Sequence, residues 1–144
     1  MTSIVQVKAD KIILNCVHYM PTELSPGILY FSEEFGMAAH LCACGCGKKV
    51  FTPIGPTDWK LTIKDGQPTL YPSVGSWQLA CQSHYWVEFG RIKWSYAWSE
   101  EQIIAGRKEE NLRSEIYYSN RQAEREKTTI FKRFVQWFLR LFKQ

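Results

Sequence analysis

The pattern of hydrophobic positions divides the chain near Trp98. Before this residue, short runs rich in β-branched and aromatic residues alternate with turn residues, which is typical of strands. These runs occupy residues 11–17, 27–32, 49–54, 59–63 and 91–98. Asp65-Gly66 favours a tight hairpin turn because both residues tolerate a positive φ, and residues 89–91 indicate a second turn. The first two-thirds of the chain therefore predicts a small, mostly antiparallel β-sheet.

The pattern after Trp98 is helical. Ser99 and Gln102 have the spacing of a capping box, in which each side chain bonds the other residue's backbone amide. No proline follows, so we expect one helix to about Arg125, a break near Thr128-Thr129, and a second helix from there. The predicted fold class is α+β.

Length and composition indicate a globular chain. The 144 residues are 45% hydrophobic and 22% charged, which is enough to build a core. The sequence shows no secretory signal and lacks the roughly 18 unbroken apolar residues of a spanning helix. We therefore expect a cytoplasmic protein, where clustered cysteines more often hold metal than form disulfides.

Two cysteine-containing segments predict a metal site. Cys42, Cys44 and Cys46 alternate in HLCACGCG, and an extended backbone would point all three thiols to one side. Cys81 and His84 follow in CQSH. Zinc prefers four tetrahedral sulfur and nitrogen ligands, often from two such clusters. We predict a Zn²⁺ cofactor bound by residues among Cys42, Cys44, Cys46, Cys81 and His84.

The ligand set stays open, because His40 is a sixth candidate for four positions. If Cys44, Cys46, Cys81 and His84 bind, then His40 and Cys42 are left over. A closed site would be structural, and sulfur-rich sites are usually of this kind. An open site would hold a water molecule and activate it as a nucleophile.

The remaining cysteine and the domain organisation complete this expectation. Cys16 stands alone in an apolar strand, where we expect a small buried side chain. We predict a zinc-binding, β-rich domain over residues 1–98 and a helical extension over residues 99–144.

Several motifs resemble those of an uncharacterised bacterial zinc-binding family. They are PGILYFS at 26–32, HLCACGCG at 40–47, TPI at 52–54, LYPSVGSW at 70–77, CQSHYW at 81–86 and GRIKW at 90–94. The resemblance covers about half of the chain. Its members are associated with operons for ubiquitin-like proteins and their conjugating enzymes, which are linked to phage defence.

The resemblance implies a hydrolase that cleaves a ubiquitin-like modifier after its C-terminal glycine, or removes it from its targets. The implied partners are the modifier and its conjugating enzymes. The alternative is a non-catalytic zinc adaptor that binds the same partners.

A peptidase needs a nucleophile and a base within hydrogen-bonding reach. Ser73, in the turn-like PSVGSW, is our candidate nucleophile, although a turn serine often bonds its own backbone. His40 and His84 compete for the role of base. His84 fits the ligand spacing better, which leaves His40 as our candidate base; the alternative is that His40 is itself a zinc ligand. Cys42 paired with a histidine is a further option. A zinc-activated water would replace the serine altogether.

Charge is distributed unevenly along the chain. Residues 1–98 carry eight Lys and Arg against seven Asp and Glu, so nucleic acid is not an expected partner. From Lys127 onward there are five basic residues and no acidic one. The segment 128–144 predicts a basic amphipathic helix. Packing within the protein or in a homodimer is the first interpretation, and a partner's groove or an anionic membrane are the alternatives.

Overall fold

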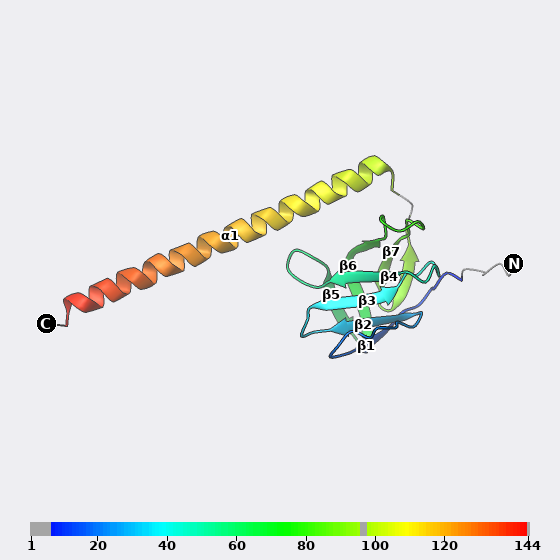
Figure 1. Cartoon of the computed structure of the whole chain (residues 1–144), viewed down its shortest axis with the longest axis horizontal. Helices are drawn as coiled ribbons and strands as arrows, with labels where there is room; N and C mark the ends of the chain where they lie inside the picture. Colours follow the sequence, from blue (N-terminus) through cyan, green and yellow to red (C-terminus); the bar gives the residue numbers. More distant parts are fainter. Residues whose placement is uncertain (1–6, 96–97, 144) are drawn as a thin grey trace. The chain divides into compact units, whose positions relative to one another are not determined.

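The computed structural model describes residues 7–95 and 98–143. Its fold is α+β, with two small sheets of mostly antiparallel strands followed by one helix (Figure 1). The chain divides into two compact units that meet between Ile103 and Ile104.

The first sheet contains four strands in the order β1-β2-β3-β4. The strands are β1 (Ile13–Cys16), β2 (Ile28–Ser32), β3 (Met37–Leu41) and β4 (Lys49–Pro53). β1 lies parallel to β2, and the other pairs are antiparallel. The β3–β4 hairpin therefore presents its connecting loop at one end of this sheet.

The second sheet is antiparallel throughout, in the order β5-β6-β7-β8. The strands are β5 (Lys60–Lys64), β6 (Gln67–Gly75), β7 (His84–Glu88) and β8 (Arg91–Trp94). The two turns predicted from the sequence are confirmed, since Asp65-Gly66 and Phe89-Gly90 all have positive φ.

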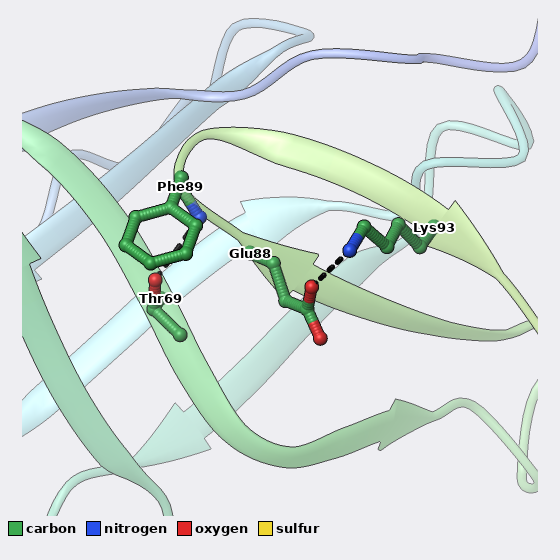
Figure 2. Close-up of polar contacts among 4 residues, drawn as sticks. All are labelled: Thr69, Glu88, Phe89 and Lys93. Atoms are coloured by element: carbon green, nitrogen blue, oxygen red, sulfur yellow. Dashed lines mark hydrogen bonds and ion pairs between the residues drawn. The ribbon is translucent and has the colours of Figure 1, made fainter.

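Side chains reinforce the second of these turns. The Phe89 amide donates to Thr69 Oγ1 on β6 at 3.0 Å, and Lys93 forms an ion pair with Glu88 across the β7–β8 hairpin (Figure 2). The end of β7 is therefore tied to both of its neighbouring strands.

One hydrophobic core takes residues from both sheets. Leu29 and Ala38 contribute from the first sheet, and Leu70 and Val87 from the second, all with no more than 1% of their surface exposed. The same cluster includes Cys42 and Cys44 (with Ala43 between them), so the loop after β3 rests on the core. Burial of this apolar surface fixes the position of the loop.

The structure departs from the sequence-based expectation in the number of sheets and strands. The strand at Met37–Leu41 was not predicted, because MAAHL lacks the β-branched residues that mark strands; its pairing with both neighbours defines it. The prediction that Cys16 is buried was wrong. Cys16 ends β1, which is paired only with β2, and its thiol is exposed.

The helix α1 runs from Glu100 to Leu141. Its predicted capping box is confirmed: the Ser99 amide donates to Gln102 Oε1 at 2.9 Å, and the Gln102 amide donates to Ser99 Oγ at 3.3 Å. Within residues 7–95 and 98–143, no helix is both long and apolar enough to cross a membrane.

The predicted break near Thr128-Thr129 was wrong, because α1 continues through both residues. Thr128 Oγ1 donates to the Glu124 carbonyl and Thr129 Oγ1 to the Arg125 carbonyl, each at 2.9 Å. Threonine hydroxyls that bond one turn back are satisfied inside a helix, so the pair does not end it.

Candidate active site and metal centre

The loop between β3 and β4 carries the first three cysteines. The Cys42 amide donates to the Lys48 carbonyl at 2.8 Å, and the Gly45 amide donates to the Cys42 carbonyl at 3.1 Å. Gly45 and Gly47 have φ of +87° and +75°, which glycine adopts without strain. The three thiols converge as expected, but they do so across a turn that the two glycines permit and not along an extended strand.

The loop between β6 and β7 carries the fourth cysteine. The Ser76 amide donates to the Ser83 carbonyl at 2.8 Å and closes the loop. Inside it, the Gln82 amide donates to the Leu79 carbonyl at 3.0 Å, and Gln82 has φ of +44°. This reversal at Gln82 lets Cys81 project on one side of the segment while the chain enters β7.

The two loops come from different sheets and meet at their sulfur atoms. The Sγ atoms of Cys42, Cys44, Cys46 and Cys81 all lie within 4.8 Å of one another. Measured pairs are 3.5 Å for Cys42–Cys44, 3.8 Å for Cys42–Cys81 and 4.0 Å for Cys46–Cys81. A zinc ion with bonds of about 2.3 Å to four tetrahedral sulfurs separates them by about 3.8 Å. These four cysteines could therefore hold a metal ion.

The protonation of these thiols depends on whether a cation is bound. Burial raises the pKa of the Cys42 thiol to about 12 and also raises that of Cys46. Burial also tends to raise the pKa of the Cys44 thiol. Hydrogen bonds from Ser83 and from the Cys46 amide outweigh this effect and lower the pKa of Cys44 to about 7. Protein groups alone do not ionise all the thiols, whereas a bound divalent cation deprotonates its thiol ligands.

A serine and a histidine meet beside this cluster. His84 Nε2 lies 2.7 Å from Ser73 Oγ, the distance of a good hydrogen bond. Gly75 on β6 is the cross-strand partner of His84 on β7, and Ser73 lies two residues before Gly75 on the same face. Ser73 is partly exposed and its carbonyl accepts a bond from Trp59 Nε1 at 3.3 Å, while His84 is buried.

Two indole rings surround the His84 imidazole. The ring centroid of Trp77 lies 5.1 Å from that of His84, and the Trp98 centroid lies 4.9 Å away. The two indoles stack on each other with centroids 5.5 Å apart. Gly75 makes room for this arrangement, because a Cβ there would lie 2.5 Å from the Trp77 ring. The rings limit the orientations that His84 can adopt.

His40 occupies a different environment. It is completely buried, its Nε2 lies 2.7 Å from the Tyr85 hydroxyl, and its Nδ1 has no hydrogen-bond partner among the residues that the structure describes. Burial lowers the pKa of His40 to about 4, so the imidazole is neutral at pH 7. The Tyr85 hydroxyl also interacts with the Cys42 thiol. His40 is therefore linked to the cysteine cluster indirectly, through the Tyr85 hydroxyl.

The structure thus distributes the predicted site residues over three groups. It brings Ser73 together with His84. It also gathers the four cysteines, and His84 is not among the potential metal ligands that cluster in the described part of the chain. It places His40 with Tyr85.

The sequence motifs account for some of the contacts in the site and not for others. The proximity of Ser83 and Tyr85 to the cysteines follows from their places in CQSHYW once Cys81 is known to belong to the cluster. For Trp98, which lies beyond the last motif, no signal in the sequence indicates a contact with His84.

Comparison with known proteins supplies a family. Residues 16–95 match the family BubE, described as bacterial ubiquitination-like system serine protease. This segment includes all eight strands except the first three residues of β1, together with Ser73, His84 and the four clustered cysteines. No curated protein and no solved structure matches the chain. The family match spans more than half of the sequence, and the chain therefore belongs to the BubE family of serine proteases from bacterial ubiquitination-like systems.

Proposed function

We propose that this protein is a serine peptidase that cleaves a bacterial ubiquitin-like modifier after its C-terminal glycine. Ser73 is the nucleophile and His84 is the general base. The observation that carries the proposal is the 2.7 Å contact between Ser73 Oγ and His84 Nε2, on a serine that substrate can reach. Among proteases, a serine hydroxyl bonded to an imidazole is the arrangement that activates the hydroxyl for acyl transfer.

The chemistry follows from this pair. Ser73 Oγ attacks the carbonyl carbon of the terminal glycine as its proton passes to His84 Nε2. His84 then gives that proton to the departing amine, and the glycine remains as an ester on Ser73. A water molecule, deprotonated by the same imidazole, hydrolyses the ester and releases the modifier with a free carboxylate.

His84 is a better base than His40 in this proposal. A base must lie within about 3.2 Å of the proton that it removes, and His84 meets this condition with Ser73. His40 Nε2 is bonded to the Tyr85 hydroxyl instead, at 2.7 Å. Cys42 as nucleophile is disfavoured for the same kind of reason, because its buried thiol belongs to the cysteine cluster.

The metal in this proposal is a structural zinc ion held by Cys42, Cys44, Cys46 and Cys81. Four sulfur ligands complete a tetrahedron, which leaves no position for a catalytic water. When bound, zinc would crosslink the β3–β4 and β6–β7 loops. Cys81 lies three residues before His84, so a fixed Cys81 helps to hold the start of β7, and with it the imidazole, against Ser73.

A glycine substrate is consistent with the shape of the site. His84 is covered by Trp77 and Trp98, and Ser73 is only partly exposed. A substrate segment that ends in glycine, which has no side chain, approaches such a nucleophile most easily. The family description places the enzyme in a ubiquitination-like system, so we propose the modifier and its conjugating enzymes as partners, a role in phage defence and a cytoplasmic location. Residues 1–98 would form the zinc-binding catalytic domain and residues 99–144 an extension.

The test uses a ubiquitin-like modifier from a bacterial ubiquitination-like system, extended by a short peptide beyond its terminal glycine. The purified protein should release this peptide, and Ser73→Ala should abolish release. A fluorophosphonate probe should label Ser73, as identified by mass spectrometry of the labelled peptide, and Ser76→Ala is the matched control that keeps both signals. Binding of the modifier without cleavage or probe labelling would instead identify a non-catalytic adaptor.

A further inference from the structure

The last turns of α1, together with Phe142 directly after the helix, carry a wide apolar face that is exposed. Its side chains are Ile130, Phe131, Phe134, Val135, Trp137, Phe138, Leu139, Leu141 and Phe142, and each is an exposed large hydrophobic residue. At 100° per residue these positions cover about 200° of the helix circumference. Exposed apolar surface of this extent marks an interaction site in a soluble protein.

The opposite face of the same segment is polar, and all of its charged residues are basic. Lys132, Arg133, Arg140 and Lys143 fall within an arc of about 100°, together with Thr129 and Gln136. No acidic residue follows Glu126. Because α1 continues through residues 128–129, this separation of charge and apolar side chains extends along one uninterrupted helix.

The preceding part of α1 has a different character. Between residues 100 and 126 acidic and basic residues are interspersed, with seven Asp and Glu among them. The exposed apolar residues are sparser there, with Leu112 and Ile116 one turn apart. The amphipathic character is therefore confined to the C-terminal segment, which we call the basic segment, residues 128–143.

We propose that the basic segment binds the surface of an anionic lipid membrane, with its apolar side chains inserted among the lipids and its basic side chains at the headgroups. Helices with Lys and Arg on one face and Trp, Phe and Leu on the other lie in the plane of the bilayer interface. The charge of the polar face complements phosphatidylserine and other acidic lipids.

The width of the apolar face favours a membrane over a second copy of the chain. A helix that packs on one partner buries a stripe of about 100°, and a coiled-coil seam is narrower still. Here about twice that arc is apolar, which a bilayer can surround and a single helix cannot. Self-association would also give no role to a polar face whose charged residues are all basic.

Flotation of the full-length protein with vesicles tests this proposal independently of any protease activity. The protein should float with phosphatidylcholine vesicles that contain phosphatidylserine, and not with phosphatidylcholine alone. Changing Lys132, Arg133, Arg140 and Lys143 to Gln should weaken binding by about fivefold for each charge. Changing Arg107, Lys108, Arg113 and Arg121 to Gln removes the same charge from the upstream helix and should leave flotation nearly unchanged.

Substitutions on the apolar face provide the second arm. Phe134→Ser with Phe138→Ser should abolish flotation, whereas Leu112→Ser with Ile116→Ser should not; circular dichroism verifies that the helix remains. Equal binding to both kinds of vesicle, or equal loss from the two sets of charge substitutions, would overturn the proposal. So would a failure to float together with a dimer, detected by analytical ultracentrifugation, that the phenylalanine substitutions dissociate.

Discussion

Cys81 and His84 are separated by only two residues, yet their side chains belong to different groups. Cys81 Sγ lies 3.8 Å from Cys42 Sγ in the cysteine cluster, and His84 Nε2 lies 2.7 Å from Ser73 Oγ. One short segment at the start of β7 therefore connects the cysteine cluster to the candidate catalytic pair. A substitution in the cysteine cluster should therefore change the behaviour of the Ser73–His84 pair, and the reverse, by a measurable amount.

Substitution of the two histidines should separate catalysis from support. His84→Gln should lower kcat by about 10²–10⁴-fold, the usual contribution of a general base. His40→Gln should leave kcat near the wild-type value and lower the free energy of unfolding by about 1–3 kcal/mol, because a buried hydrogen bond to Tyr85 is disturbed. Steady-state kinetics and urea denaturation of both variants provide the measurement; a large loss of kcat in His40→Gln alone would assign the base to His40.

Thiol accessibility should report the metal directly. With zinc bound, only Cys16 should react with a thiol reagent, although Cys81 is also exposed, because a zinc-bound thiolate is protected. After treatment with a strong chelator all five cysteines should react. In Cys16→Ser the native protein should show no reactive thiol. Rapid labelling of the clustered cysteines in carefully prepared native protein, with no zinc found by elemental analysis, would contradict the metal site.

The indole rings around His84 should matter more for catalysis than for stability. Gly75→Ala places a Cβ 2.5 Å from the Trp77 ring and must displace it, which should lower kcat/KM by about 10²-fold through misplacement of His84. Gly55→Ala is the control, since its Cβ would meet only the movable Asp58 carboxylate, at 3.2 Å. Unchanged kinetics in a folded Gly75→Ala protein would show that the rings do not position the base.

Removal of the Tyr85 hydroxyl should weaken the metal site selectively. Tyr85→Phe breaks the connection between His40 and Cys42, and such supporting hydrogen bonds typically contribute 10–100-fold to metal affinity. Competition with a chromogenic chelator measures the affinity. Tyr30→Phe deletes a hydroxyl that accepts a bond from the Ser25 amide, away from the cluster, and should leave zinc affinity unchanged.

Features fixed by local chemistry could be predicted from the sequence. Asp65-Gly66 forms a tight turn wherever two strands flank it, and the reciprocal bonds of Ser99 and Gln102 depend only on residues three apart. The association of the chain with bacterial ubiquitination-like systems was likewise indicated by its motifs. For the turn and the capping box, the residues that define the feature are neighbours along the chain.

Features fixed by tertiary packing could not be predicted in the same way. The spacing of Cys81 and His84 suits a shared metal, and only the pairing of Gly75 with His84 turns the imidazole toward Ser73. The choice between His40 and His84 therefore depends on strand register, which the sequence does not reveal. The position of Trp98 depends on how the chain leaves β8, where no motif remains to indicate it.

The sulfur cluster has a consequence for the order of folding. Cys46 and Cys81 are 35 residues apart, on hairpins of different sheets. In a nascent chain, three of the four thiols would come together as soon as the β3–β4 hairpin forms. The fourth, Cys81, would join them only when the β6–β7 hairpin packs against the first sheet. Full-affinity capture of zinc would then be a late event that reports on assembly of both sheets, so immature enzyme would lack a fixed imidazole until that step is complete.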